Sequence, residues 1–155
     1  MRRILCFVLS ILLLIQITAC QTYSSISLGL KFEESAMAKK EDGQWIKVSD
    51  QVFQKGDIVG MVLLNVSGFK KDDSGKNWVE LGVEIKDSEG NIVLSQEDLL
   101  GEAGKKVMEN NMEESLIGLV DTNKELEPGK YHFKLKVYDK IGGGKIESTR
   151  SFTLE

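Results

Sequence analysis

Acid–base chemistry needs a histidine or carboxylate held beside a second polar group, and the chain contains one histidine, His132. It lies in the segment YHFKLKVYD, where apolar and polar residues alternate and place His132 on the polar side. No nearby serine or carboxylate pattern resembles a catalytic triad. The sequence therefore predicts no catalytic residue, and an enzyme that uses His132 is only the third interpretation.

Oxygen ligands for a metal ion are most concentrated in KDDSGKN, residues 71–77, where Asp72, Asp73 and Asn77 surround Gly75. The spacing departs from the D-x-D-x-D-G loop that binds Ca²⁺, and the distal bidentate glutamate is missing. A solvated hairpin tip explains the same residues. We therefore expect no metal site and no cofactor.

Aromatic side chains are the remaining candidates for a binding site. Trp78 and Tyr138 take the outward parity of their segments, and Trp45 is the second tryptophan of the chain. Exposed rings on a flat sheet can stack on pyranose sugars, and tryptophan is enriched at protein interfaces. The alternative is that each ring covers a strand end or packs beneath a loop.

The thiol of Cys20 follows an N-terminal segment with the layout of a secretory signal. A basic tip with Arg2 and Arg3 precedes an apolar stretch, and small residues come directly before the cysteine. The stretch at 4–19 is shorter than the roughly 20 apolar residues that span a bilayer. We expect residues 1–19 to be a cleaved signal peptide; an ordinary secretory signal and an uncleaved anchor are the alternatives.

The motif Ile17-Thr18-Ala19-Cys20 resembles the lipobox of bacterial lipoprotein precursors. The resemblance implies that Cys20 receives a diacylglycerol through its sulfur, that the signal is cut before it, and that its new amine is acylated. Two or three acyl chains anchor a protein stably, whereas one holds it only marginally. Gln21 stands where the enterobacterial sorting rule would use Asp for inner-membrane retention, so the resemblance favours the outer membrane of a bacterial cell envelope.

Charge and cysteine usage limit the partners of the remaining chain. Loss of residues 1–19 removes Arg2 and Arg3 but no acidic residue, which takes the formal net charge from −4 to −6. Such a surface matches phosphate backbones poorly, so we expect no nucleic acid partner. With Cys6 removed and Cys20 acylated, no thiol is left for a disulfide, and about 135 residues suffice for one hydrophobic core.

Period-two alternation predicts strands along most of the chain. The segment DIVGMVLLNV at 57–66 is apolar at both parities, as expected for a central strand covered on two faces. Turn residues at 41–44, 87–91 and 141–145 separate the strands. The alternating apolar positions are Tyr131, Phe133, Leu135 and Val137; Val79, Leu81, Val83 and Ile85; Ile26, Leu28, Leu30 and Phe32; and Ile146, Phe152 and Leu154.

Residues 96–115 break the alternation. Leu99, Ala103 and Val107 recur at helical spacing, but Gly101 and Gly104 each cost such a helix about 1 kcal/mol relative to alanine. The sequence therefore predicts an all-β fold, an antiparallel sandwich of about seven to eight strands, with at most one short helix in the 96–115 crossover.

The segment LEPGKYHFKLKVYDKIGGGK resembles the closing hairpin of bacterial immunoglobulin-like modules. Pro128 followed by Gly129 is a type II turn signature at its start. The resemblance implies an immunoglobulin-like sandwich in which the hydroxyl of Tyr131 ties the preceding loop to the sheet, as in a tyrosine corner. Phe133 occupies the place of the cysteine in antibody-type domains.

These observations give one organisation: signal peptide 1–19, lipidated cysteine and short tether 20–25, and β-sandwich domain 26–155. The five residues of the tether reach less than about 18 Å, so the domain would lie close to the bilayer. We expect a lipid-anchored extracytoplasmic protein that binds an envelope protein partner or supports an envelope assembly without catalysis. The alternative is a carbohydrate-binding surface lipoprotein that uses Trp45, Trp78 and Tyr138.

Overall fold

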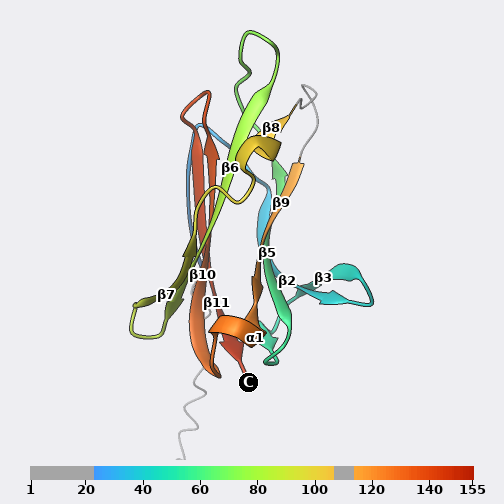
Figure 1. The fold of residues 1–155 in the computed structure, drawn as a ribbon, viewed down its shortest axis with the longest axis vertical. Helices are drawn as coiled ribbons and strands as arrows, with labels where there is room; N and C mark the ends of the chain where they lie inside the picture. Colours follow the sequence, from blue (N-terminus) through green and yellow to red (C-terminus); the bar gives the residue numbers. More distant parts are fainter. Residues whose placement is uncertain (1–22, 107–113) are drawn as a thin grey trace, which may run out of the picture.

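The computed structural model describes residues 23–106 and 114–155, which form two β-sheets packed face to face (Figure 1). The expected signal peptide, Cys20 and the first residues of the tether lie outside the described residues. The all-β prediction is confirmed. The strands are β1 (Tyr23–Leu28), β2 (Glu34–Glu41), β3 (Gln44–Val48), β4 (Val52–Phe53), β5 (Ile58–Val66), β6 (Asn77–Asp87), β7 (Ile92–Gln96), β8 (Lys105–Lys106), β9 (Glu114–Asp121), β10 (Gly129–Asp139) and β11 (Lys145–Leu154).

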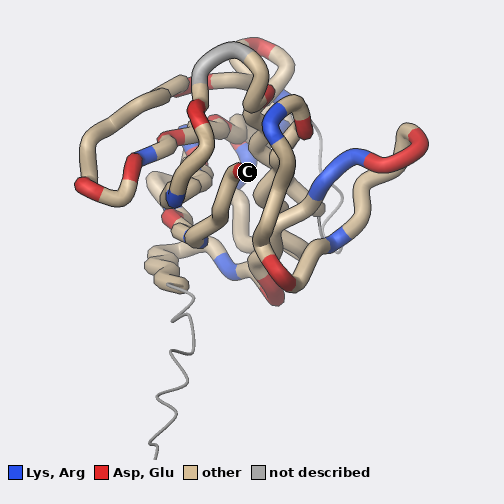
Figure 2. The backbone as a smooth tube through the Cα atoms, turned by 90° about the horizontal axis from the view of Figure 1, so that it is seen from below, with Lys and Arg blue, Asp and Glu red and all other residues tan. Residues whose placement is uncertain are grey.

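The seven-stranded sheet has the order β1-β11-β10-β6-β7, with β4 added to β11 and β8 added to β6. The four-stranded sheet has the order β3-β2-β5-β9. All pairs are antiparallel except β4 with β11, which is parallel over two residues. The hairpin of β2 and β3 projects from the body of the sandwich in two perpendicular views (Figures 1 and 2).

The core fills the space between the sheets, and on β6, β10 and β11 its side chains are those that the alternation predicted. Strand β10 alternates buried and half-buried residues along its length, with Phe133, Leu135 and Val137 fully buried. The sheets approach each other closely at Gly118 of β9. A Cβ placed there would lie 2.6 Å from side-chain carbons of both Leu135 and Val83, so this position has no room for a side chain.

The number of strands was underestimated. Eleven strands are present in the described part of the chain rather than seven to eight, because β4 and β8 are only two residues long and β9 lies partly in the segment read as a crossover. The described part of 96–115 contains a four-residue 3₁₀ helix, η1 (Gly101–Gly104). A second short helix, α1 (Thr122–Glu125), follows β9 outside the predicted crossover.

The first strand also differs from the prediction. It begins at Tyr23 rather than at Ile26, because residues 23–25 continue the antiparallel pairing with β11. Ile26 and Leu28 are 61% and 63% exposed, since β1 is an edge strand and their side chains share the outward face with Glu147 and Lys145 of β11. Of the alternating apolar residues in this segment, only Leu30 joins the core as a buried residue.

The predicted tyrosine contact forms before β10, but the predicted type II turn does not. Gly129 already pairs with Leu154 as the first residue of β10, and its φ is not positive, as a type II turn would require. The hydroxyl of Tyr131 donates a hydrogen bond of 2.6 Å to the backbone carbonyl of Glu127. The ring of Tyr131 stacks on Phe152 with centroids 5.5 Å apart, so this residue joins the loop to the core.

We predict that Tyr131→Phe lowers the free energy of unfolding by about 1 kcal/mol, because the Glu127 carbonyl loses its donor while the ring packing is kept. Urea unfolding followed by circular dichroism measures the change. Tyr138→Phe is the matched control, since it removes the same group from a half-buried outward position. Equal stability of the two variants would show that the Tyr131 hydroxyl does not hold the loop.

Candidate binding surface

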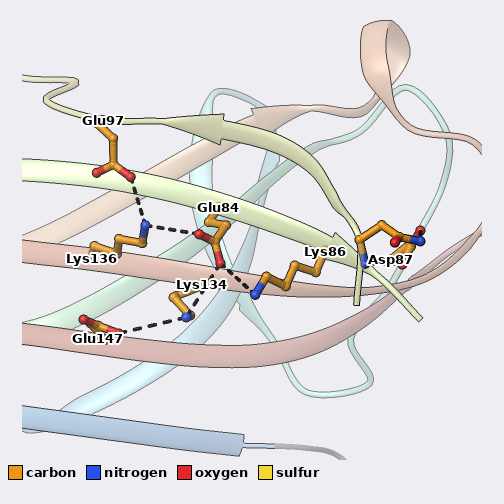
Figure 3. Close-up of polar contacts among 8 residues, drawn as sticks. Glu84, Lys86, Asp87, Glu97, Lys134, Lys136 and Glu147 are labelled. Atoms are coloured by element: carbon orange, nitrogen blue, oxygen red, sulfur yellow. Dashed lines mark hydrogen bonds and ion pairs between the residues drawn. The ribbon is translucent and has the colours of Figure 1, made fainter. Parts of the chain in front are cut away.

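The outward face of the seven-stranded sheet is a lattice of opposite charges. The carboxylate of Glu84 on β6 lies 3.2 Å from Nζ of Lys136, 3.4 Å from that of Lys86 and 3.6 Å from that of Lys134 (Figure 3). Lys136 is also 2.9 Å from Glu97. Cross-strand pairing of β6 with β10 places these side chains side by side, so the face is polar and internally neutralised.

Glu84 is only 8% exposed, because the lysine side chains lie over it. Burial alone would raise the pKa of its carboxyl group. The hydrogen bond from Lys136 and the positive charges of Lys136, Lys134 and Lys86 outweigh burial and lower this pKa. Glu84 is therefore ionised and neutralised at neutral pH, and its place in the centre of the lattice gives it a structural role.

Trp78 lies on the same face but is covered. Nζ of Lys105 lies 4.0 Å from the centroid of the ring and Nζ of Lys140 lies 4.9 Å from it, both as cation–π contacts. The Nε1 atom is buried and has no hydrogen-bond partner in the described part of the chain. A sugar could stack on this ring only by displacing a lysine.

His132 has a neighbour that the sequence did not reveal. Its Nδ1 lies 3.1 Å from Oγ of Ser151, because the two residues are directly opposite each other on β10 and β11. The residue opposite His132 on the other side is Lys86 of β6. The Nζ atom of Lys86 lies 3.4 Å from the carboxylate of Glu84, so the contact described for His132 is the one with the Ser151 hydroxyl.

The outward face of the four-stranded sheet has the opposite character. Strand register places small and aliphatic residues of β2, β5 and β9 on it, together with Trp45 of β3. The charged residues Glu34, Lys40 and Lys47 share this face on the side of β2 and β3. No described element packs on this side of the sheet (Figure 1). We call this surface the outer apolar face; it consists of Ala36, Ala38, Trp45, Gly60, Val62, Leu64, Ile117 and Leu119.

Gly60 organises the centre of the outer apolar face. A Cβ at this position would lie 3.1 Å from Cδ1 of Ile117, 3.2 Å from Cδ2 of Leu119 and 3.2 Å from Cζ3 of Trp45. Strand β2 separates β3 from β5, so the indole must cross β2 to reach Gly60. It therefore lies along the sheet above Ala38, which is 3% exposed, and side chains from β3 and β9 converge on one glycine of β5.

The convergent side chains remain accessible to a ligand. Trp45 is 37% exposed and Leu119 is 42% exposed, while Ile117 is half-buried. An ion pair between Lys47 and Glu34 lies at the β3–β2 edge. The surface thus combines an aromatic ring packed on the sheet, an exposed leucine beside it and charged residues at its border. This arrangement is typical of protein interfaces.

The structure separates the aromatic residues that the sequence singled out. Trp45 belongs to the four-stranded sheet, whereas Trp78 and Tyr138 belong to the seven-stranded sheet, so the three rings form no common platform. Sequence reasoning missed Gly60, Ile117 and Leu119. The available signal was the apolar character of both parities at 57–66, which was interpreted as a strand covered on two faces.

No protein-family model and no curated protein matches the sequence. Among solved structures, the C-terminal domain of Wzt is similar, with a TM-score of 0.53 and 10% identity over 88% of this chain and 79% of that domain. The PmoD soluble domain from Methylocystis sp. gives 0.39 and 8% identity over 81% and 96% of the two chains. Chicken MD-1 complexed with lipid IVa gives 0.39 and 12% over 85% and 99%. The likeness to the Wzt domain concerns the two-sheet fold alone.

We predict that Glu84→Gln lowers the free energy of unfolding at pH 7 by about 1 to 3 kcal/mol, because three lysines lose the negative charge that they share. Since the pKa of Glu84 is lowered in the folded protein, its contribution is present above the ordinary value of 4.5 and is lost as the pH falls through the folded value. The two proteins should therefore converge in acid.

Urea unfolding at pH 7 and at stepwise lower pH measures this difference. Glu102→Gln is the control, because Glu102 forms a single exposed ion pair with Lys105 and should change stability by less than about 0.5 kcal/mol. A Glu84→Gln penalty that matches the control, or that persists unchanged in acid, would contradict a charge-based role for Glu84.

Proposed function

We propose that this chain is a lipid-anchored extracytoplasmic binding protein of a bacterial envelope, that it acts without catalysis, and that the outer apolar face is its binding surface. The observation that carries the proposal is the convergence of Trp45, Ile117 and Leu119 over Gly60 on a face that no described element covers. Interface energy concentrates in well-packed aromatic anchors with aliphatic neighbours, and exposed apolar patches of this kind mark interaction sites.

The proposed anchor rests on the lipobox-like motif that ends at Cys20. Strand β1 begins at Tyr23, so only Gln21 and Thr22 separate the acylated residue from the sheet. Three residue steps reach about 11 Å at most, which keeps the domain against the bilayer. A partner in or on the same membrane, the outer membrane by the analogy at Gln21, would meet the domain at short range.

No helix in the described part of the chain is long and apolar enough to cross a membrane.

The finer fold assignment, an immunoglobulin-like sandwich, is part of the proposal. It is supported by the hydrogen bond from Tyr131 to the carbonyl of Glu127, four residues earlier, which is the contact of a tyrosine corner. The absence of catalysis is supported by the residues around His132, where Ser151 lies on one side and Lys86 on the other.

A carbohydrate ligand is the second candidate function, and the geometry of Trp45 favours it. The indole lies along the sheet with part of its surface exposed, which is the arrangement that stacks on a pyranose ring. Trp78 would not contribute, since Lys105 and Lys140 cover it. Only one aromatic platform remains, so we place a protein partner first.

We predict that a photo-crosslinking residue at position 119 captures a defined envelope protein in native membranes. The same residue at position 149, a half-buried outward position on the charged sheet, should give at least about tenfold less adduct, because hot spots lie in the apolar centre of an interface. Trp45→Ala should reduce capture at 119. Equal labelling at both positions would rule out the outer apolar face as the binding surface.

Tryptophan fluorescence with added envelope glycans tests the second candidate on the same chain. A glycan-dependent shift that is lost in Trp45→Ala but kept in Trp78→Ala would make the ligand a carbohydrate. A shift lost only in Trp78→Ala would contradict the placement of the site on the four-stranded sheet.

We predict that the native protein purified from membranes begins at Cys20 and carries the added mass of a diacylglycerol and an amide-linked acyl chain. Cys20→Ser should lack this mass and be depleted from the membrane fraction, because the proposed acyl chains are lost. Intact mass spectrometry of both proteins measures the difference. A native N-terminus at Met1, or an unmodified Cys20, would overturn the anchor.

A further inference from the structure

Strand β1 is an open edge of the seven-stranded sheet. Its residues Tyr23–Leu28 pair with β11 on one side, and the other side has no strand in the described part of the chain. The sequence YSSISL contains no charged residue, no proline and no glycine, and its register with β11 is continuous over all six residues. An unprotected edge of this kind is a template for pairing with another strand.

The other edge strands carry protective features. Register shifts where β7 pairs with β6, between Ile85 and Lys86, and such an irregularity twists an edge away from further pairing. The pairing of β9 with β5 also shifts register, between Leu63 and Val66, and β3 contains Lys47. Charges and irregularities are how native proteins prevent edge-to-edge pairing, so their absence from β1 indicates that this edge has a partner.

The exposed side chains of β1 support the same conclusion. Ile26 and Leu28 are 61% and 63% exposed, although the β11 residues opposite them are charged. Glu147 lies opposite Ile26 and Lys145 lies opposite Leu28. Burial of these aliphatic side chains would be favourable, and a further strand paired at the open edge of β1 would provide it.

We propose that β1 pairs antiparallel with β1 of a second copy of this chain. In an antiparallel strand pair, side chains directly opposite each other lie on the same face of the sheet. The outward side chains of the two copies therefore share a face only when residues of equal parity are opposite each other, and the two-fold axis then lies at a residue position rather than between two residues. An axis at Ile26 pairs Ile26 with its symmetry mate, Ser25 with Ser27, and Ser24 with Leu28. This register uses the strand from Ser24 to Leu28 and brings the four aliphatic side chains of the two copies together.

A second copy fits this edge better than an unrelated strand. The self-paired register places no like charges opposite each other, since the segment has none. The two-fold axis of an antiparallel pair is perpendicular to the sheet, so both Tyr23 residues lie at the same height along it and both tethers reach one membrane. This last step rests on the proposed anchor, which also confines the copies to two dimensions and raises their effective concentration.

Disulfide trapping in native membranes tests the register. Ile26→Cys should form a cross-linked dimer in most molecules after mild oxidation, because directly opposed Cβ atoms lie about 4.5–5.5 Å apart, close to the span of a disulfide. Leu28→Cys alone should not cross-link, since the two Leu28 residues would be separated by about 13 Å along the strands. The double variant Ser24→Cys/Leu28→Cys should cross-link again. Val93→Cys on β7 is the control at the irregular edge.

Sedimentation of the full lipidated protein in detergent provides a second measurement. Ile26→Lys should weaken dimerisation by about tenfold or more, because two lysines would oppose each other at the axis. A wild-type chain that stays monomeric at all concentrations, or Ile26→Cys that never cross-links, overturns the pairing and leaves the anchor standing. Cross-linking of the wild type through Cys20 contradicts the anchor instead, and the Ile26→Cys test is then repeated with Cys20→Ser.

Discussion

Burial of one face of each sheet against the other is the constraint on which the rest of the structure depends. Fully buried residues of β10, such as Phe133 and Leu135, and of β6, such as Val83, form the core with residues of β5 and β9. Gly118 lets the sheets approach closely enough to exclude a side chain. Because each sheet has only two faces, the two outward faces are left to meet the surroundings, and their chemistry determines what the domain can bind.

The two outward faces differ in their chemistry. On the seven-stranded sheet, Glu84 and its lysines neutralise each other across β6 and β10, and Trp78 is covered by two further lysines. On the four-stranded sheet, the indole of Trp45 packs over the small residues Gly60 and Ala38. A charge lattice that satisfies itself gains little from a partner, whereas exposed apolar side chains do gain. We therefore assign the proposed binding function to the four-stranded sheet.

Local pattern predicted the parts of the fold that depend on a single strand. The alternation at 131–137 and 79–85 identified the inward residues of β10 and β6 correctly. It failed at Ile26 and Leu28, because alternation does not tell which face an edge strand turns to the core. The candidate site could not be predicted from the sequence. Trp45, Gly60 and Leu119 are neighbours only because of the strand order β3-β2-β5-β9 and its register, and no spacing in the sequence contains that information.

The central claim is that a partner covers the outer apolar face in the native envelope. Hydroxyl-radical footprinting of intact envelopes and of the purified protein tests it directly, with Tyr138 on the charged sheet as the internal reference. The account predicts that Trp45 and Leu119 are oxidised several-fold less in envelopes than in the purified protein, while Tyr138 is oxidised equally in both. Equal oxidation of Trp45 and Leu119 in both samples, or protection of Tyr138 alone, would contradict it.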